Sequence, residues 1–288
     1  MIKDLILVNG EILERSKAVI AFGDRGQQFG DGVFELVPVY NRRCFALLPH
    51  MESLFASVMS IKIPGVYTVE ELVEFHEGLI AATGLENGEI YTQVTRGHGN
   101  GGLAFPDMMM PQLTMFAVEK DRTCLQEVQE KGVNVITATD QRWQRCDINS
   151  LNRLPEVLAK QKAIVGKAFE TLFVRDTKIT EAVEGNLMVV KDEIIWTHPA
   201  NNLIHNTIAG RLVKERLVPD MGMQVLEKAC TVDFALGAEE VFLVGPHYEV
   251  VPVTKIDRKF VATKQVGAVT KKIQAAFKNF IAKECPKK

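Results

Sequence analysis

The sequence predicts a two-domain protein of the mixed α/β or α+β class. Three observations support this prediction. The chain has 288 residues, which is long for one domain of about 100 to 150 residues. Hydrophobic residues make up 47% and charged residues 24%, as in ordinary globular proteins. Short strand-like segments are mixed with separated amphipathic segments, without a repeat or a regular βαβ series. We expect a smaller N-terminal domain in residues 1–120, a connecting segment in 121–131 and a larger C-terminal domain in 132–288.

The first half begins with apolar residues on both sides of Asn9-Gly10, a pair typical of the type I′ turn of a β-hairpin. Apolar spacing then predicts strands and helices in turn. We expect strands at 33–40 and 42–48, helices at 50–61 and 69–83, and adjacent strands at 89–97 and 112–120. The loop that joins the last two is rich in glycine, which favours sharp turns or mobility. Residues 119–131 become charged and lose their periodicity, so we place the domain connection there.

The second half continues with strand-like and helix-like segments of similar length. We expect a strand at 133–140, a helix at 155–168, a strand at 170–176 and a strand pair at 186–197 turning at Lys191-Asp192. A helix at 207–218, a short helix from Thr231, strands at 239–245 and 248–256 and a closing helix at 265–283 complete the series.

Charge and cysteine content exclude several classes of function. The formal net charge is −2, which gives no general attraction to nucleic acid or to an acidic membrane surface. The apolar run at the N-terminus is too short for a signal sequence or a membrane span, so we expect a cytoplasmic protein. Five cysteines without a CxxC pair indicate free thiols. The histidine spacing indicates no metal site.

Four segments carry a resemblance to a known family. They are DRGQQFGDGVFE at 24–35, RWQRCDINSLNRLPEVLAKQKA at 142–163, TEAVEGN at 180–186 and THPANNLI at 197–204. Their order and spacing resemble the class IV aminotransferases, pyridoxal phosphate enzymes of fold type IV, and most closely the bacterial D-amino acid aminotransferases. The resemblance implies the two-domain fold of that family and a homodimer, with a cleft between the domains that would bind a small molecule.

The lysine that such enzymes need is missing at its position in the motif. In the family, a lysine two residues before Leu-Asn carries the cofactor as a Schiff base and moves the substrate proton. The matching residue here is Asn149, and an amide does not form an imine. Lys160 and Lys162 follow on a predicted helix, where we expect both side chains to contact solvent.

Most positions that hold the cofactor in the family also differ. Serine offers one neutral donor where the family has an arginine that binds phosphate with two charge-assisted hydrogen bonds. Proline has no backbone N–H to donate, and a carboxylate beside the phosphate would repel it. The matching positions are Ser53, Glu184, Ala209, Gly245 and Pro246. Only Glu181 is retained; in the family it pairs with the pyridine nitrogen, and here it could meet a basic ring or a buried arginine.

The substrate-binding positions differ as well. Family members bind the substrate carboxylate with a tyrosine, an arginine and a histidine, which match Phe34, Gly101 and Leu103 here. None of these three residues supplies a charge or a hydroxyl. A small shift of the alignment would bring in nearby polar residues instead. The replacements for the carboxylate site would then be Arg96, His98 and Asn100.

Together these residues predict a divergent homologue that does not transaminate, needs no cofactor, and binds another small molecule or a protein partner. Two alternatives remain open. One is an active pyridoxal phosphate enzyme with a non-standard site, either an aminotransferase of D- or branched-chain amino acids or a 4-amino-4-deoxychorismate lyase. The other is a cofactor-free enzyme that uses Glu181, Glu184 and His98 as acid and base.

Overall fold

Contacts within the chain separate it into two units whose sequences interleave. A computed structural model describes residues 1–65, 67–99, 101–262 and 265–287. The first unit comprises Met1–Asp121, Ile148–Asn152 and Ile281–Lys288, and the second comprises Arg122–Asp147 and Arg153–Phe280. The predicted connecting segment contains a regular helix, α4 (Thr123–Lys131), which groups with the second unit.

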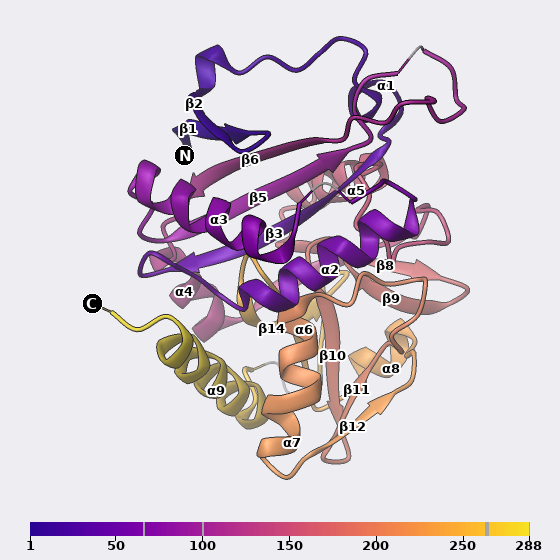
Figure 1. Ribbon diagram of the computed structural model, residues 1–288. Helices are drawn as coiled ribbons and strands as arrows, with labels where there is room; N and C mark the ends of the chain where they lie inside the picture. The colour runs from indigo at the N-terminus through magenta and orange to yellow at the C-terminus, as the bar shows by residue number, and fades with distance from the viewer. Residues whose placement is uncertain (66, 100, 263–264, 288) are drawn as a thin grey trace. The chain divides into compact units, whose positions relative to one another are not determined.

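The first unit is built on an antiparallel sheet. Within its described residues the sheet has six strands in the order β2-β1-β6-β5-β3-β4. The strands are β1 (Ile2–Val8), β2 (Glu11–Glu14), β3 (Gly32–Tyr40), β4 (Arg43–Cys44), β5 (Gly88–Thr95) and β6 (Gln112–Glu119). The helices are a 3₁₀ turn η1 (Arg15–Lys17), α1 (Arg25–Phe29), α2 (Leu47–Ser60) and α3 (Val69–Thr83). Figure 1 shows α2 and α3 in front of β3 and β5, and the side chains between them form the buried core of this unit.

Local sequence explains most of these elements. The predicted hairpin at Asn9-Gly10 is confirmed, because both residues have positive φ, 49° and 88°, as a type I′ turn requires. Helix α3 begins with a capping box in which Thr68 and Glu71 each accept a hydrogen bond from the other's backbone N–H. The strand predicted at 42–48 is shorter than expected. Ala46 takes a left-handed conformation, φ 49°, and α2 starts at Leu47.

The second unit contains a mixed sheet. Its described residues form nine strands in the order β12-β11-β10-β13-β14-β7-β8-β9, with β15 paired to β14. The strands are β7 (Val133–Thr139), β8 (Glu170–Arg175), β9 (Lys178–Ala182), β10 (Asn186–Lys191), β11 (Ile194–Thr197), β12 (Gln224–Glu227), β13 (Glu240–Gly245), β14 (Glu249–Ile256) and β15 (Lys259–Phe260). Three neighbouring pairs are parallel, namely β11–β12, β14–β7 and β7–β8.

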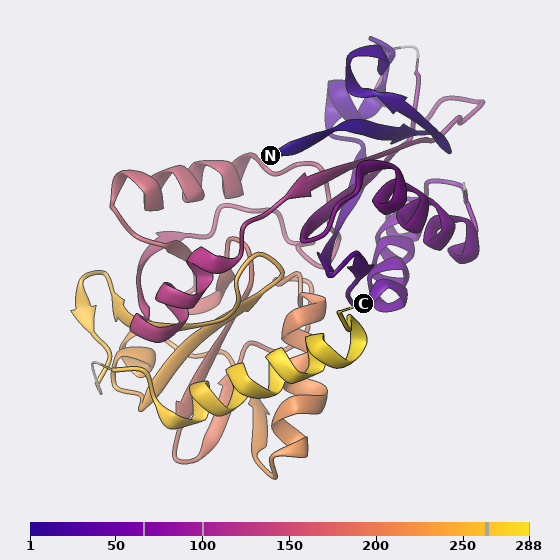
Figure 2. The same cartoon turned by 90° about the vertical axis from the view of Figure 1, so that its left-hand side faces the viewer.

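The second unit also contains helices, several of which pack against this mixed sheet. They are α4, α5 (Leu154–Val165), α6 (Ile208–Leu212), a π-helical turn η2 (Val213–Leu217), α7 (Val218–Asp220), α8 (Val232–Leu236) and α9 (Ala268–Glu284). Helix α9 crosses the strands in Figure 2, and Gln274 donates hydrogen bonds to the carbonyls of Gln129 and Val250. The Glu240 carboxylate accepts the backbone N–H groups of Val269 and Thr270 at the start of α9. No helix among the described residues is both long and apolar enough to cross a membrane.

Candidate functional site

Asn149 lies in the first unit, on the short segment Ile148–Asn152. Its backbone N–H donates to Ser57 Oγ at 3.2 Å, and its carbonyl accepts the N–H of Phe34 at 2.8 Å. The next residue, Ser150, forms an isolated β-bridge with Val33. The segment is therefore held against α2 and β3 by its backbone, which leaves the half-buried Asn149 side chain as the chemical group at the lysine position.

The neighbouring substrate and cofactor positions of this unit lack charge. Phe34 is buried and stacks on Tyr91, with ring centroids 5.0 Å apart and planes 8° from parallel. Ser53 is half-buried on α2, one helical turn before Ser57. A stacked phenyl ring has no hydroxyl to offer a carboxylate, and Ser53 brings no positive charge.

Arg96 does not replace the lost carboxylate site. Its side chain is 1% exposed, and its guanidinium donates to both oxygens of Asp31 at 2.8 and 2.9 Å and to the carbonyls of Ile61 and Lys62 at 2.7 and 2.9 Å. These bonds engage its donors inside the fold. His98 is exposed, and Asn100 lies outside the described residues.

Arg25 holds the loop around Gly101 and Leu103 through hydrogen bonds to its backbone. The guanidinium of Arg25 binds Asp31 at 2.8 Å and donates to the carbonyls of Gly102, Leu103 and Ala104 at 2.6, 3.0 and 3.1 Å. The Leu103 side chain points outward and is 81% exposed. Gly101 has φ 78°, and a side chain at this position would meet nothing within 4 Å of its Cβ. These two positions therefore supply no binding group.

Glu181, the retained position, is a buried carboxylate of the second unit on β9. Its oxygens accept hydrogen bonds from Arg142 Nη1, from the His205 N–H at 3.0 Å and from Asn186 Nδ2 at 3.3 Å. Burial raises the pKa of Glu181 to about 7, although Arg142 opposes that rise. Arg142 also donates to Asp140 at 2.9 Å. Of the two partners expected for Glu181, the structure shows the buried arginine, and a backbone amide binds the same carboxylate.

Ala209 lies in the first turn of α6 and has no hydroxyl group. The hydroxyl group at the start of this helix belongs to Thr207. Thr207 Oγ1 accepts the N–H of Gly210 at 3.0 Å, which caps the helix, and donates to Asn186 Oδ1 at 2.8 Å. Ala209 itself is buried and adds only a methyl group. Thr207 is thus used to fix the helix start against β10.

Lys160 does not contact solvent freely, and this corrects our expectation. Its ammonium donates to Glu184 at 2.6 Å and to Glu170 at 3.3 Å. His247 Nε2 lies 3.7 Å from the other oxygen of Glu184. Burial would raise the pKa of Glu184, but His247 and Lys160 hold it below its usual range. The sequence spacing hid this pairing, because 24 residues separate the two partners. Lys162 stays at the surface and donates to the Thr137 carbonyl.

Tyr248 is another residue of this region that the sequence did not single out. Its ring packs against two glycines, since a Cβ on Gly185 would meet Tyr248 Oη at 2.3 Å and a Cβ on Gly245 would meet its Cζ at 2.9 Å. The side chain is 2% exposed, and burial raises its pKa well above the usual value. A neutral phenol therefore lies beside Gly245.

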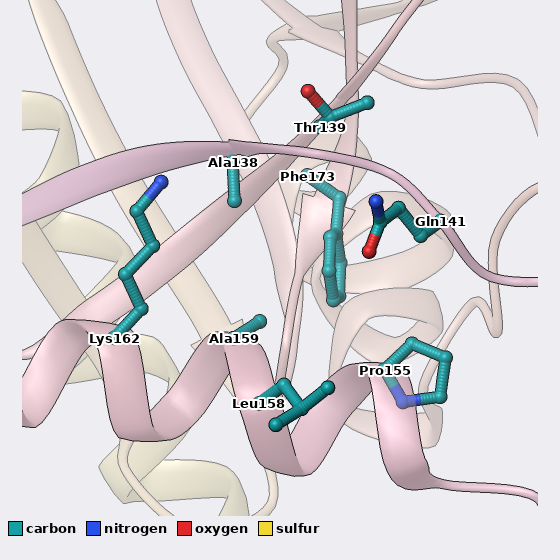
Figure 3. Close-up of a pocket in the computed structure, with 8 residues that line it drawn as sticks. All are labelled: Ala138, Thr139, Gln141, Pro155, Leu158, Ala159, Lys162 and Phe173. Atoms are coloured by element: carbon teal, nitrogen blue, oxygen red, sulfur yellow. The ribbon is translucent and has the colours of Figure 1, made fainter.

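A hollow of about 250 Å³ opens in the second unit between α5 and the strands β7 and β8 (Figure 3). Apolar Leu158, Pro155 and Phe173 line it together with Gln141 and Lys162. The Arg142 guanidinium stacks on the Phe173 ring at 4.3 Å, so this ring takes part both in the hollow and in the surroundings of the Glu181 pair. Of the positions that the sequence singled out, only Lys162 borders the hollow.

Comparison with known proteins gives a consistent picture. The family model described as amino-transferase class IV matches residues 32–256. A D-alanine aminotransferase of Bacillus licheniformis is 38% identical over 282 residues, which cover 98% of this chain and 99% of that protein. A D-alanine aminotransferase of Staphylococcus aureus strain COL is 38% identical over 96% of this chain and 97% of its own length.

Solved structures share the fold. The branched-chain amino acid aminotransferase of Escherichia coli superposes with a TM-score of 0.90 at 24% identity, covering 99% of this chain and 97% of that one. The branched-chain amino acid aminotransferase from Thermobaculum terrenum, solved in its PLP-form (holo-form), gives a TM-score of 0.84 at 19% identity, with coverage of 98% and 95%. The predicted two-domain mixed α/β fold is therefore confirmed.

These matches contradict our expectation that the chain needs no cofactor. The relatives are aminotransferases, and the Thermobaculum terrenum structure is a holo-form that contains the cofactor. We inferred loss of cofactor binding from the loss of single contacts. Each protein contact supplies only part of the affinity for a cofactor, so the loss of several does not establish the loss of binding. Of the residues at the cofactor positions, Glu181 offers an acidic group of the kind that a pyridine nitrogen meets. Asn149 does not fit a covalent bond, because an amide nitrogen is not a nucleophilic amine.

Proposed function

The chain belongs to the class IV aminotransferase family, and from this premise we propose that it has lost the transaminase activity of its relatives. The observation that carries the proposal is Asn149, held by its backbone at the lysine position. Transamination needs a base that takes a proton from one carbon and returns it to another. An amide has no basic nitrogen for this step.

Lys160 does not supply the missing amine. Burial alone would lower its pKa, but Glu170 and Glu184 more than offset this effect and raise it. The ammonium therefore stays protonated and bound between two carboxylates, without a lone pair for attack. The substrate positions support the same conclusion, since Arg96 is engaged with Asp31 and Phe34 carries no hydroxyl.

A second candidate function is an active aminotransferase with a non-standard site. Identity of 38% to D-alanine aminotransferases over nearly the whole chain favours it. In this case Lys160 would be the amine, and its two carboxylate partners would have to release it. The two candidates therefore differ in whether the purified chain turns over amino acids and whether Lys160 is required.

The test measures amino transfer from D-alanine, and from branched-chain amino acids, to 2-oxo acids with excess pyridoxal phosphate. The Bacillus licheniformis relative serves as the active reference. We expect no amino transfer above the uncatalysed background for this chain. Turnover that Lys160→Gln abolishes would overturn the proposal and establish the second candidate.

A gain-of-function variant tests the assignment of position 149 separately from activity. Asn149→Lys restores the amine at the position matched to the family lysine. With pyridoxal phosphate and borohydride, we expect mass spectrometry to find the cofactor fixed on the peptide that contains residue 149. Asn149→Gln is the matched control and should show no such peptide. Failure of Asn149→Lys to react would mean that residue 149 does not occupy the lysine position.

A further inference from the structure

Two of the five cysteines come together in the first unit. Cys44 is the last residue of β4, and Cys285 directly follows α9. Both belong to the first unit, although Cys285 and the residue before Cys44 are 242 positions apart in the chain. The other three cysteines lie in the second unit, and all five are free thiols. Local spacing in the sequence does not indicate this pair.

Hydrogen bonds place the Cys285 thiol against the backbone of Cys44. The Cys285 carbonyl accepts the side-chain N–H of Asn41 at 2.7 Å, which fixes residue 285 at the turn between β3 and β4 (Figure 2). Its Sγ donates to the Arg43 carbonyl at 3.6 Å. A carbonyl oxygen lies about 2.8 Å from the next Cα in a trans peptide, so Cys285 Sγ is within about 6.4 Å of Cys44 Cα. A disulfide between the two therefore needs rotation of the side chains and no rearrangement of the sheet.

We propose that Cys44 and Cys285 are an oxidation site of this protein, at which a small-molecule disulfide joins them in an intramolecular disulfide. The product ties the C-terminal segment to the turn between β3 and β4 within the first unit. The inference goes beyond the proposed loss of transaminase activity and does not depend on it, because neither sulfur belongs to a position singled out for cofactor or substrate.

The surroundings of the two thiols make the bond slow to form and hard to reduce. Burial raises the pKa of Cys44 to about 12, and the neighbouring Cys285 and Glu77 add to the rise. Burial also raises the pKa of Cys285 to about 11, where Glu284 adds to the rise and Arg43 opposes it. Few thiolates are then present to attack a disulfide. The same high pKa makes each sulfur a poor leaving group, so the finished disulfide resists reduction.

The oxidation proceeds by two successive exchanges. The Cys44 thiolate attacks one sulfur of the small disulfide, which forms a mixed disulfide and releases one thiolate. The Cys285 thiolate then attacks the Cys44 sulfur, closes the protein disulfide and releases the second small thiolate. Two cysteine sulfurs are oxidised, the small disulfide is reduced to two thiols, and the two cysteine protons pass to the released thiolates. Cys44 reacts first because it is half-buried, whereas Cys285 is 0% exposed.

Mass spectrometry of the folded full-length chain is the direct test. The chain is held with excess oxidised glutathione at pH 8.5, the reaction is stopped with acid, and the unfolded chain is treated with N-ethylmaleimide and digested without reductant. We expect one linked pair of peptides, which contain Cys44 and Cys285, while the buried Cys146 and Cys230 carry N-ethylmaleimide. Reductant added before digestion should abolish the linked pair. If Cys44 and Cys285 both carry N-ethylmaleimide after several days of incubation, the proposal is wrong.

Single variants test the two exchange steps. Cys285→Ala removes the second thiol, so we expect glutathione to stay on Cys44 as a mixed disulfide. Cys44→Ala leaves only the buried thiol, and residue 285 should then stay unmodified in the folded chain. Alanine keeps the site apolar, and thermal unfolding shows that each variant is folded. Linkage of the remaining thiol to a different cysteine in either variant would overturn the proposal, because the two residues would then not be a specific pair.

Thermal stability gives a second readout of the bond. A disulfide restricts the unfolded chain more as the loop that it closes grows longer, and this loop spans most of the sequence. The first unit of the oxidised chain should therefore unfold several degrees above that of the same chain after reduction. Cys44→Ala should show no such difference. Cys146→Ala, which removes a buried thiol of the second unit, should keep it. Equal unfolding temperatures of the oxidised and reduced chain would contradict the proposed tie between the C-terminal segment and the turn.

Discussion

Glu170 shows how one buried carboxyl makes the stability of this fold depend on pH. The residue is fully buried at the start of β8, and burial raises its pKa from 4.5 to about 7 despite the opposing charge of Lys160. A folded-state pKa above the unfolded value favours folding at low pH, and this contribution is lost as pH rises from about 4.5 to 7. The shift corresponds to roughly 3 kcal/mol.

We therefore expect Glu170→Gln to remove part of this pH dependence. The free energy of unfolding in urea at pH 5 and pH 8 is the measurement. For the unmodified chain, the value should fall by up to about 3 kcal/mol more over this range than for the variant. Glu127→Gln on the exposed side of α4 is the control and should leave the difference unchanged. Equal pH dependence in the unmodified chain and in Glu170→Gln would show that Glu170 titrates at its ordinary pKa.

Asp31 has the opposite dependence on pH. Burial would raise its pKa, but hydrogen bonds from Arg96 and Arg25 hold the pKa below 3.8. Its contribution is present above the unfolded value and is lost as pH falls through the lowered one. Asp31→Asn leaves two buried guanidinium groups without their carboxylate, so we expect a loss of about 3 to 5 kcal/mol at pH 7. Chemical unfolding at pH 7 and pH 3 measures this loss, which should be smaller at pH 3. A variant as stable as the unmodified chain at pH 7 would show that solvent compensates both arginines.

The sequence was informative at the residue scale where a motif fixed the position. Asn149 and Glu181 could be assigned because they lie inside continuous matching segments. The partners of Glu181 and Glu184 could not, since they depend on which strands and helices come together. Arg142 lies 39 residues before Glu181, and nothing in local spacing connects the two.

At the scale of single elements, the loop between β5 and β6 depends on Arg25. This side chain binds three successive carbonyls of residues 102–104, and the Arg96 guanidinium stacks on Phe105 at 3.7 Å. Arg25→Lys keeps the charge but loses the planar set of donors. We expect faster hydrogen exchange in residues 101–106, with unchanged exchange in α3. Arg15→Lys on the exposed η1 turn is the control. Unchanged exchange in the loop would show that its own backbone holds it in place.

Elements with clear periodicity or standard turn residues were predicted well, and the others were not. Helix α3 matched its expected limits, and the first hairpin turns at the expected Asn9-Gly10 pair. Strand β9 was missed because Asp176 and Thr177 form its turn, both with positive φ, and threonine is rarely found in that conformation. Helix α4 was missed because its residues are mostly polar. Packing of a few apolar side chains against β14 stabilises such a helix more than its sequence pattern indicates.

At the scale of the whole molecule, the sequence predicted the fold and the family but not the interleaving of the two units. Similar segments in the right order were sufficient to predict the fold and the family. The interleaving depends on long-range contacts, because residues 148–152 and 281–288 group with the first unit although most of their neighbours in sequence belong to the second unit. Sequence order alone gives one boundary, whereas the contacts give four.

Removal of the last eight residues should therefore affect strands near the start of the chain. Cys285 is fully buried, its carbonyl accepts a hydrogen bond from Asn41 Nδ2 at 2.7 Å, and Ile281 is also buried. Loss of these contacts should destabilise the first unit by about 2 kcal/mol or more. Hydrogen exchange should then accelerate in residues 39–45, which form the turn between β3 and β4, and stay unchanged in β10 and β13. Deletion of residues 286–288 alone keeps Cys285 and should have no such effect. If both truncations leave the turn equally protected, the C-terminal segment does not stabilise the first unit, because its removal would then cost nothing there.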